Sequence, residues 1–149
     1  MVSDRPSAVR GRDYRQGDHI CALYQTPVEQ LAVAVDYIAD GLRRNERCLY
    51  SAPTEADLDE FSRSLTAAGI DARAAAREQR LLLLTKDAAH LQPGYFSAEA
   101  MLHKLSELVE DALNDGYDGL RTCGDMSWLL DEAPGSHEIV DYEGLLSAF

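Results

Sequence analysis

The polar residues that could do chemistry together are concentrated in one short stretch, Arg121-Thr-Cys-Gly-Asp-Met-Ser-Trp128. Gly124 permits a sharp turn where a strand would end. Asp125 and Trp128 would then bring a carboxylate and an apolar ring to one place, which is the usual make-up of a small-molecule site. The other interpretation is structural, with Asp125 capping a helix and Trp128 packing in the core. The residues alone leave both interpretations open.

Arg121 raises a separate question because it alternates with Cys123 on one strand face. A guanidinium in an otherwise apolar sheet needs a carboxylate partner, since an unpaired buried charge is costly. Asp125 and Asp18 are the candidate partners. Arg121 could instead anchor a ligand, so ion pairing and ligand binding both remain open.

A second group of candidates lies in the run His19-Ile-Cys-Ala-Leu-Tyr24. On a strand, His19 and Cys21 would face one way and Tyr24 the other. The pair His19-x-Cys21 could supply two metal ligands, but structural zinc sites need four at tighter spacings, so no metal is predicted. His19 is either a satisfied structural histidine or a pocket residue. The three cysteines, Cys21, Cys48 and Cys123, suggest no disulfide framework.

No catalytic nucleophile stands out in the chain. The sequence has no GxSxG turn and no cysteine beside an orienting pair, so we do not expect an enzyme. Tyr95 lies in a long predicted loop, residues 86–97, and is expected to be a lid residue, because loops of this length in small domains are often functional. His90, His103 and His137 are expected at the surface.

These residues are positioned by short apolar strands that alternate with longer amphipathic helices. The sequence predicts strands at 19–24, 47–51, 81–85 and 119–123. It predicts helical segments at 27–45, 55–68, 71–79, 98–115 and 136–149, with Thr26, Thr54 and Ser97 as N-caps of the three long ones. This alternation is typical of an α/β domain with a mainly parallel sheet covered on both faces.

The predicted domain occupies residues 18–149, after a flexible N-terminal arm at 1–17 that lacks the apolar core of a signal peptide. No apolar run is long enough to span a membrane, so a cytoplasmic protein is expected. The net charge of −12 argues against direct nucleic-acid binding. The helical pattern runs up to Phe149, which suggests that a further strand is missing. The bare edge or apolar face left behind would favour a homo-oligomer.

Ligands of a parallel sheet bind beyond the carboxyl ends of its strands. A nucleotide would need a glycine-rich loop after the first strand, where backbone amides hold the phosphates. That position reads Tyr24-Gln-Thr-Pro-Val28, with no glycine and no lysine. The phosphate loop is therefore degenerate, and no cofactor is predicted.

Three stretches, taken in order, resemble the MEDS domain, a sensory domain of methanogens and methylotrophs: 17–24, 41–50 and 119–128. Tyr142-Glu143 fits the same pattern, and the similarity covers residues 17–149. The resemblance implies a RecA/KaiC-like α/β fold without a working P-loop. It also implies a sensor of small, simple organic molecules, joined to histidine kinases, anti-sigma-type kinases, STAS modules or DNA-binding domains.

The family pattern continues past Tyr142-Glu143 into a strand with a Cys-x-Tyr-Asp-like segment, which this chain lacks. The residues expected to bind the ligand are His19, Cys21, Tyr24, Tyr95, Arg121, Asp125 and Trp128. We therefore expect a sensory domain that binds a small organic molecule and relays the signal to a regulatory partner or a fused output domain. The alternative is a ligand-free protein–protein interaction module on a degenerate nucleotide-binding fold.

The missing phosphate loop gives a direct test. Titration with Mg-ATP in an isothermal calorimeter is expected to give no binding heat, because residues 24–28 offer no backbone cradle for phosphates. A dissociation constant in the low micromolar range would contradict this prediction.

Overall fold

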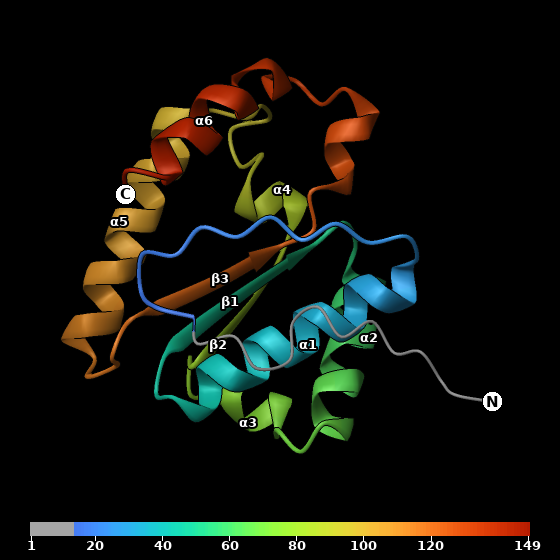
Figure 1. Ribbon diagram of the computed structural model, residues 1–149, viewed down its shortest axis with the longest axis vertical. Coiled ribbons are helices and arrows are strands. Elements are labelled where there is room, and N and C mark those ends of the chain that lie inside the picture. Colours follow the sequence, from blue (N-terminus) through green and yellow to red (C-terminus); the bar gives the residue numbers. More distant parts are fainter. Residues whose placement is uncertain (1–13) are drawn as a thin grey trace.

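The computed structural model describes residues 14–149, which form an α/β domain on a small parallel sheet (Figure 1). The strands are β1 (Arg47–Ala52), β2 (Leu81–Thr85) and β3 (Leu120–Gly124), in the order β2-β1-β3. Both neighbours run parallel to β1, which confirms the predicted α/β class and parallel sheet. Residues 1–13 of the expected flexible arm lie outside the described residues. The RecA/KaiC-like relationship stays a prediction.

The strand predicted at 19–24 is absent from this sheet. These residues run as an extended trace in Figure 1 but pair with no strand. Their apolar side chains are exposed, with Ile20 at 42% and Leu23 at 95%. The prediction of a buried strand is wrong here because β-forming side chains make a segment suitable for a sheet but supply no neighbouring strand. His19, Cys21 and Tyr24 therefore lie on a surface segment.

The three long helices begin where the sequence predicts. Thr26, Thr54 and Ser97 each accept a backbone hydrogen bond at the starts of α1 (Pro27–Arg43), α2 (Glu55–Ala67) and α5 (Ala98–Asn114). Such caps satisfy backbone N–H groups that have no partner within the helix. The short α3 (Ala72–Arg77) falls within the helical segment predicted at 71–79. Over residues 14–149, every helix is too short or too polar to cross a membrane.

The short elements differ from the prediction. The expected loop at 86–97 begins with α4 (Lys86–Ala89), capped by Thr85. After β3 the chain forms the 3-10 helix η1 (Ser127–Asp131). The predicted C-terminal helix is divided into η2 (Ser136–Glu138) and α6 (Ile139–Leu146). Elements this short hold too few residues for hydrophobic periodicity to reveal them.

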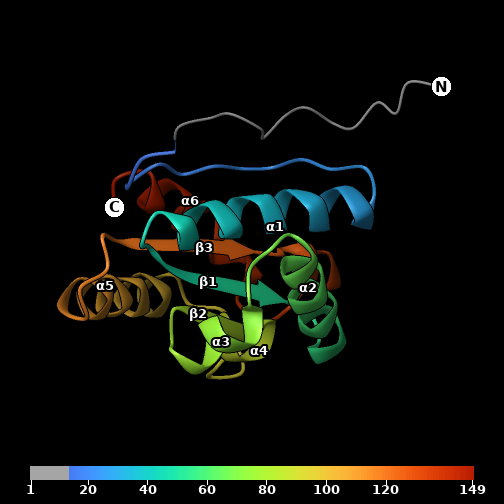
Figure 2. The same cartoon turned by 90° about the horizontal axis from the view of Figure 1, so that it is seen from below.

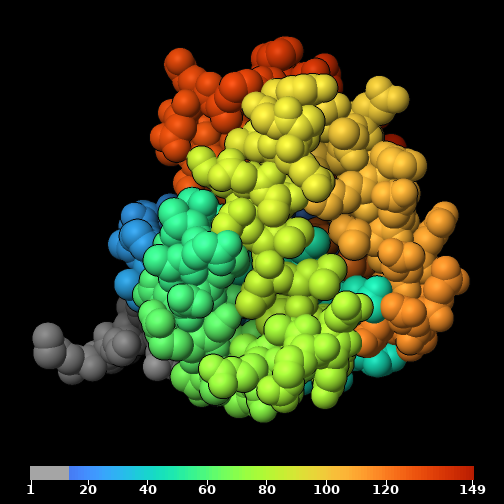
Figure 3. Space-filling model, turned by 180° about the vertical axis from the view of Figure 1, so that it is seen from behind, coloured from blue at the N-terminus to red at the C-terminus, as the bar shows by residue number. Residues whose placement is uncertain are grey.

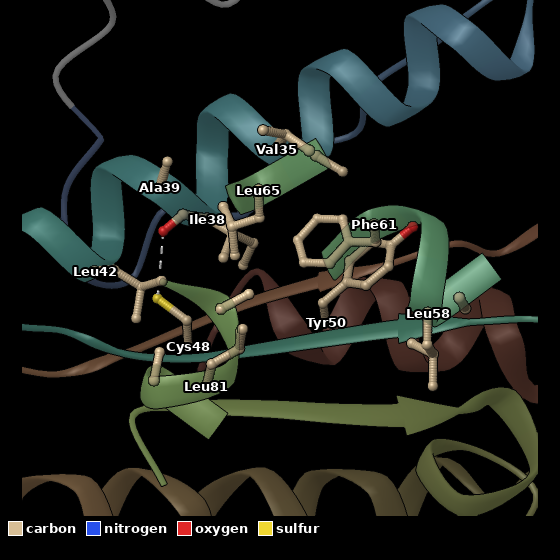
Figure 4. Packing of buried hydrophobic residues seen from close by; sticks show 14 residues of the cluster. Val35, Ile38, Ala39, Leu42, Cys48, Tyr50, Leu58, Phe61, Leu65 and Leu81 are labelled. Atoms are coloured by element: carbon tan, nitrogen blue, oxygen red, sulfur yellow. Dashed lines mark hydrogen bonds between the residues drawn. The ribbon is translucent and has the colours of Figure 1, made fainter. Parts of the chain in front are cut away.

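The larger hydrophobic core lies between the sheet and the helices α1 to α3 (Figure 4). The ring of Tyr50 on β1 stacks on Phe61 from α2, with ring centroids 3.8 Å apart. Ile38 and Leu42 of α1 are buried over Cys48 at the start of the same strand. Each such side chain contributes roughly 1.5–3 kcal/mol through burial, so this core fixes α1 and α2 on the sheet.

The opposite face of the sheet is covered by α4 and α5. Figure 2 shows α1 on one side of the strands and α5 on the other, so the sheet is the middle layer of three. A second hydrophobic cluster joins α5 to η1 and α6 through Phe96, Met101, Trp128 and Tyr142. This cluster holds the segment that follows β3, where the sequence places its candidate pocket.

Arg121 is buried on the α1 side of the sheet and is paired with two carboxylates. Its Nε lies 2.5 Å from Oε2 of Glu46, and its Nη1 lies 2.9 Å from Oδ2 of Asp40. The ion pair expected for Arg121 is present, but the expected partners Asp125 and Asp18 are wrong. The actual partners lie near the end of α1 and just before β1. We refer to these three side chains as the Arg121 cluster.

The surroundings of the Arg121 cluster are closely fitted. A Cβ on Gly41 would lie 2.7 Å from Cδ of Arg121 and 2.8 Å from Sγ of Cys48, so only glycine leaves room for the guanidinium. The rings of Tyr37 and Tyr14 lie 4.7 Å and 5.7 Å from Cζ of Arg121 and cover it. The cluster is therefore part of the packing of α1 against β3.

Replacement of Arg121 tests this structural role. Arg121→Met should lower the free energy of unfolding by about 3–5 kcal/mol, because it leaves the buried Glu46 carboxylate without its only cationic partner among the described residues. Urea denaturation measures the change. Arg44→Met is the matched control, since Arg44 pairs with the same Asp40 at the surface and should cost about 1 kcal/mol or less. Equal losses in the two variants would contradict the assignment.

Candidate functional site

The carboxyl ends of β1 and β3 are held together at Ser51 and Gly124. The N–H of Asp125 donates to the carbonyl oxygen of Ser51 at 2.9 Å. Oγ of Ser51 lies 3.0 Å from Nε2 of His90, which follows α4. A Cβ on Gly124 would lie 3.1 Å from this Oγ and 3.5 Å from this Nε2. The close approach of β3 to the Ser51–His90 pair therefore depends on a residue without a side chain.

His90 lies inside this group, so the expectation of a surface histidine is wrong. Burial, and next the positive charge of Lys104, lower the pKa of His90 to about 4, so its ring is neutral near pH 7. Lys104 is nearby because its Nζ donates to the carbonyl oxygen of Ala88 at 2.8 Å. No sequence signal joins Ser51 to His90. They are 39 residues apart, and the pairing of β1 with β2 brings them together.

Trp128 packs against the face of His90. The two rings are stacked with centroids 5.5 Å apart, and Phe96 packs on Trp128 at 5.8 Å. Trp128 is 1% exposed. Its Nε1 and the Nδ1 of His90 are buried and lack a hydrogen-bond partner within residues 14–149. Native protein interiors leave few buried polar atoms without a hydrogen bond. The rings of His90 and Trp128 therefore stand out as polar groups beside the otherwise apolar second cluster.

A cleft of about 300 Å³ lies between α5 and the segment that follows β2, and His90 forms part of its wall. Figure 3 looks onto this face, where the yellow-green residues 86–97 lie against the yellow-to-orange α5. The cleft is lined by Ala89, His90, Gln92, Pro93, Tyr95, Ser97, Ala100, Met101, His103, Lys104 and Glu107. We call it the α4–α5 cleft. Its volume is at the lower end of the range for small-molecule sites.

Asp125 belongs to a different part of the same strand end. Its Oδ1 accepts the N–H of Ser127 at 2.8 Å and shapes the turn before η1. The N-cap of η1 is Met126, without a side-chain hydrogen bond, so Asp125 is a turn residue and not the helix cap considered from the sequence. Burial, and next the negative charge of Asp125, raise the pKa of Tyr24. Asp125 and Tyr24 are therefore within electrostatic reach of each other. Neither of them lines the α4–α5 cleft.

The other predicted site residues are distributed more widely. Tyr95 lines the cleft, whereas Arg121 is enclosed in its ion cluster. His19 places Nε2 2.8 Å from Oε2 of Glu143 on α6, and Cys21 is exposed. Tyr95 thus lines the same cleft as His90, and Trp128 stacks on His90, whereas the other predicted residues do not line this cleft. Within the described range, no group of three His, Cys, Asp or Glu side chains could hold a metal ion.

Ser51 and His90 have the separation of a nucleophile and its base, but Ser51 is 1% exposed, so its hydroxyl is shielded from solvent. Burial raises the pKa values of Cys48 and Cys123 to about 12, so both remain protonated thiols.

Comparisons with known proteins support a sensory role. The family model described as "MEthanogen/methylotroph, DcmR Sensory domain" (MEDS) matches residues 18–149. Among curated proteins, the transcriptional repressor DcmR of Methylorubrum extorquens (strain DSM 6343 / CIP 106787 / DM4) is 28% identical over 151 residues, which cover 95% of this chain and 53% of the repressor. The chain thus spans about half the length of this relative. No solved structure matches the chain.

The lowered pKa of His90 predicts a pH-dependent stability. As the pH falls below about 6.5, the unfolded chain binds a proton at this histidine while the folded chain does not. The free energy of unfolding therefore falls, by about 2 kcal/mol between pH 7 and pH 5. His90→Gln keeps an amide that can bond Ser51 but removes the titration. Urea midpoints of both proteins at the two pH values isolate the effect, and equal pH slopes would contradict it.

Proposed function

The chain belongs to the MEDS family of sensory domains, and we propose that it senses a small organic molecule bound in the α4–α5 cleft. The observation that supports this proposal is the position of His90. One part of this residue lines the cleft, while its ring face stacks on Trp128 in the interior. A ligand that moved His90 would therefore also move a buried aromatic ring.

The proposed signal passes from Trp128 into the C-terminal elements. Trp128 lies within η1, and Phe96 contacts both Trp128 and Tyr142 of α6, with ring centroids 5.8 Å and 5.3 Å apart. Such a packed cluster shifts between discrete arrangements rather than deforming smoothly. We propose that α6 carries the change to a regulatory output in the cytoplasm, which could be a kinase, an anti-sigma factor or a transcription regulator. The repressor relative is consistent with the last of these.

One of the seven residues expected from the sequence lines the α4–α5 cleft, and a second reaches it through His90. Tyr95 is half-exposed at its wall, where a loop side chain can cover a ligand, and Trp128 lies behind His90. In this proposal Asp125 and Tyr24 shape the neighbouring strand end rather than the ligand. The chemistry of the wall is mixed, with Lys104 and Glu107 beside Met101 and Ala100. This lining favours a small molecule with both an apolar part and a polar group.

A ligand-free interaction module is the second candidate. Leu130 of η1 and Val140 of α6 are 86% and 76% exposed, and exposed apolar side chains on neighbouring elements can recruit a protein partner. In that case the α4–α5 cleft would have no occupant, and the surface of η1 and α6 would carry the function alone.

Trp128 is the only tryptophan and reports on the cleft directly. A panel of short-chain alcohols, amines, carboxylic acids and halomethanes should contain a compound that shifts its fluorescence at saturating concentration. Ala100→Phe, an exposed position on the cleft wall, fills the space and should weaken that compound at least tenfold, about 1.4 kcal/mol.

Ala56→Phe on the exposed side of α2 is the matched control and should bind normally. Equal affinity in the Ala100→Phe variant and the wild type would exclude the cleft as the binding site. A panel that leaves the emission of Trp128 unchanged throughout would favour the interaction module.

A further inference from the structure

The edge of β3 that faces away from β1 has no neighbouring strand within residues 14–149. Gly119 and Asp125 both bond to β1, through Arg47 and Ser51. Because a parallel ladder alternates with a period of two, the N–H and C=O groups of Leu120, Thr122 and Gly124 point to the other edge. Such a row of unpaired backbone groups is a template for one more strand.

One segment of the same chain contacts the start of this edge and comes within electrostatic range of its other end. Gln16 contacts Gly119 at the start of β3, and its Nε2 donates to Oε1 of Glu46 at 3.0 Å. At the other end, Tyr24 is within electrostatic reach of Asp125. In the projection of Figure 1 the blue trace between these two points runs in the same direction as β3. Figure 2 shows it out of the plane of the sheet, on the α1 side and beyond the level of α1, so docking requires the segment to move toward the sheet.

The segment between Gln16 and Tyr24 has a composition typical of a strand and makes few contacts with the rest of the domain. Residues 19–24 have no backbone–backbone hydrogen bond within the described part of the chain. Ile20, Leu23 and Tyr24 are exposed although they are good strand formers. Residues 20–28 carry no charge in a chain of net charge −12. The contact that holds the middle of the segment is the pair between His19 and Glu143 of α6.

We propose that the free edge of β3 is a docking site for residues 19–24 of the same chain, which add to the sheet as a fourth, parallel strand in a second state of the domain. Docking would pair the backbone groups of Leu120, Thr122 and Gly124 and would cover Ile20 and Leu23. The structure describes the undocked state, in which His19 is held on α6. Docking would bring Tyr24 next to Asp125 at the end of β3. This inference does not depend on the ligand proposed above.

Eight residues separate Gln16 from Tyr24 but only six separate Gly119 from Asp125, so a regular parallel ladder keeps one of the two alignments. Alignment of Tyr24 with Asp125 places Cys21 opposite Thr122, and a shift by one residue places it opposite Cys123. Neighbouring strands are about 4.8 Å apart, which is within the Cα separation that a disulfide can bridge. A disulfide from Cys21 can therefore report docking, and position 122 is the more accessible partner because Thr122 is exposed whereas the thiol of Cys123 packs against the core.

Disulfide trapping with copper–phenanthroline tests the proposal on two proteins. The first is the native chain, and the second carries Thr122→Cys with Cys123→Ser, which moves the acceptor thiol by one position. Docking predicts a monomeric product in which peptide mapping finds Cys21 bonded to residue 123 or 122. Ala56→Cys with Cys123→Ser is the control for random collision, since it puts an exposed thiol on α2. The docked pair should form at least ten times faster than this control.

Two results would overturn the proposal. One is a rate no higher than that of the control at both positions. The other is a product found only between chains, which would mean that the edge pairs with a second copy. Glu143→Gln, which weakens the tie to His19, should raise the rate of the intrachain product, and a lower rate would count against docking.

Discussion

The pairing of the buried Arg121 with Glu46 and Asp40 is the constraint on which the rest of the molecule depends. Among residues 14–149, β3 has a neighbouring strand on one side only, so backbone pairing alone holds it weakly. The guanidinium ties this edge strand to α1 and to the residue before β1, and Gly41 leaves the space for it. β3 ends at Gly124 and continues into Asp125 and η1, which contains Trp128. The ion pairs that fix the start of β3 therefore also help to fix the position of the Ser51–His90–Trp128 group at its end.

This arrangement divides β3 into a closely packed half and a half beside the proposed binding cleft. The half near Arg121 is closed, with two carboxylates and two tyrosine rings around the charge. The carboxyl end is less complete. There a neutral histidine and a tryptophan each bury a polar atom that lacks a partner among residues 14–149, beside a cleft. Natural proteins tend to break the rules of polar pairing and packing at functional sites. Buried polar atoms without partners beside a cleft are therefore consistent with membership of a sensory family.

Much of the fold could be predicted from the sequence, because local signals specify it. The caps Thr26, Thr54 and Ser97 and the apolar runs of β1, β2 and β3 are all readable within a few residues. The prediction failed at 19–24, where the side chains suit a strand but the neighbouring strand is a matter of tertiary structure. The short α4 was missed for a related reason, since four residues show no periodicity.

The site was harder to predict than the fold. Trp128 and Tyr95 were predicted because a lone tryptophan after a strand and a tyrosine in a long loop are visible signals, and Tyr95 lines the proposed cleft while Trp128 stacks on His90 in its wall. Ser51 and His90 carry no such signal, since only the parallel pairing of β1 with β2 makes them neighbours. The partners of Arg121 lie 75 and 81 residues away along the chain, and nearby carboxylates were the natural but wrong choice.

The division of β3 can be tested most directly by following two side-chain N–H groups by NMR while a cleft ligand is titrated. The chain has one indole N–H, that of Trp128, and the Nε–H of Arg121 is buried against Glu46. Ligand binding should move the Trp128 indole signal and leave the Arg121 signal in place. A ligand that moved the Arg121 signal while the indole stayed unchanged would contradict the account.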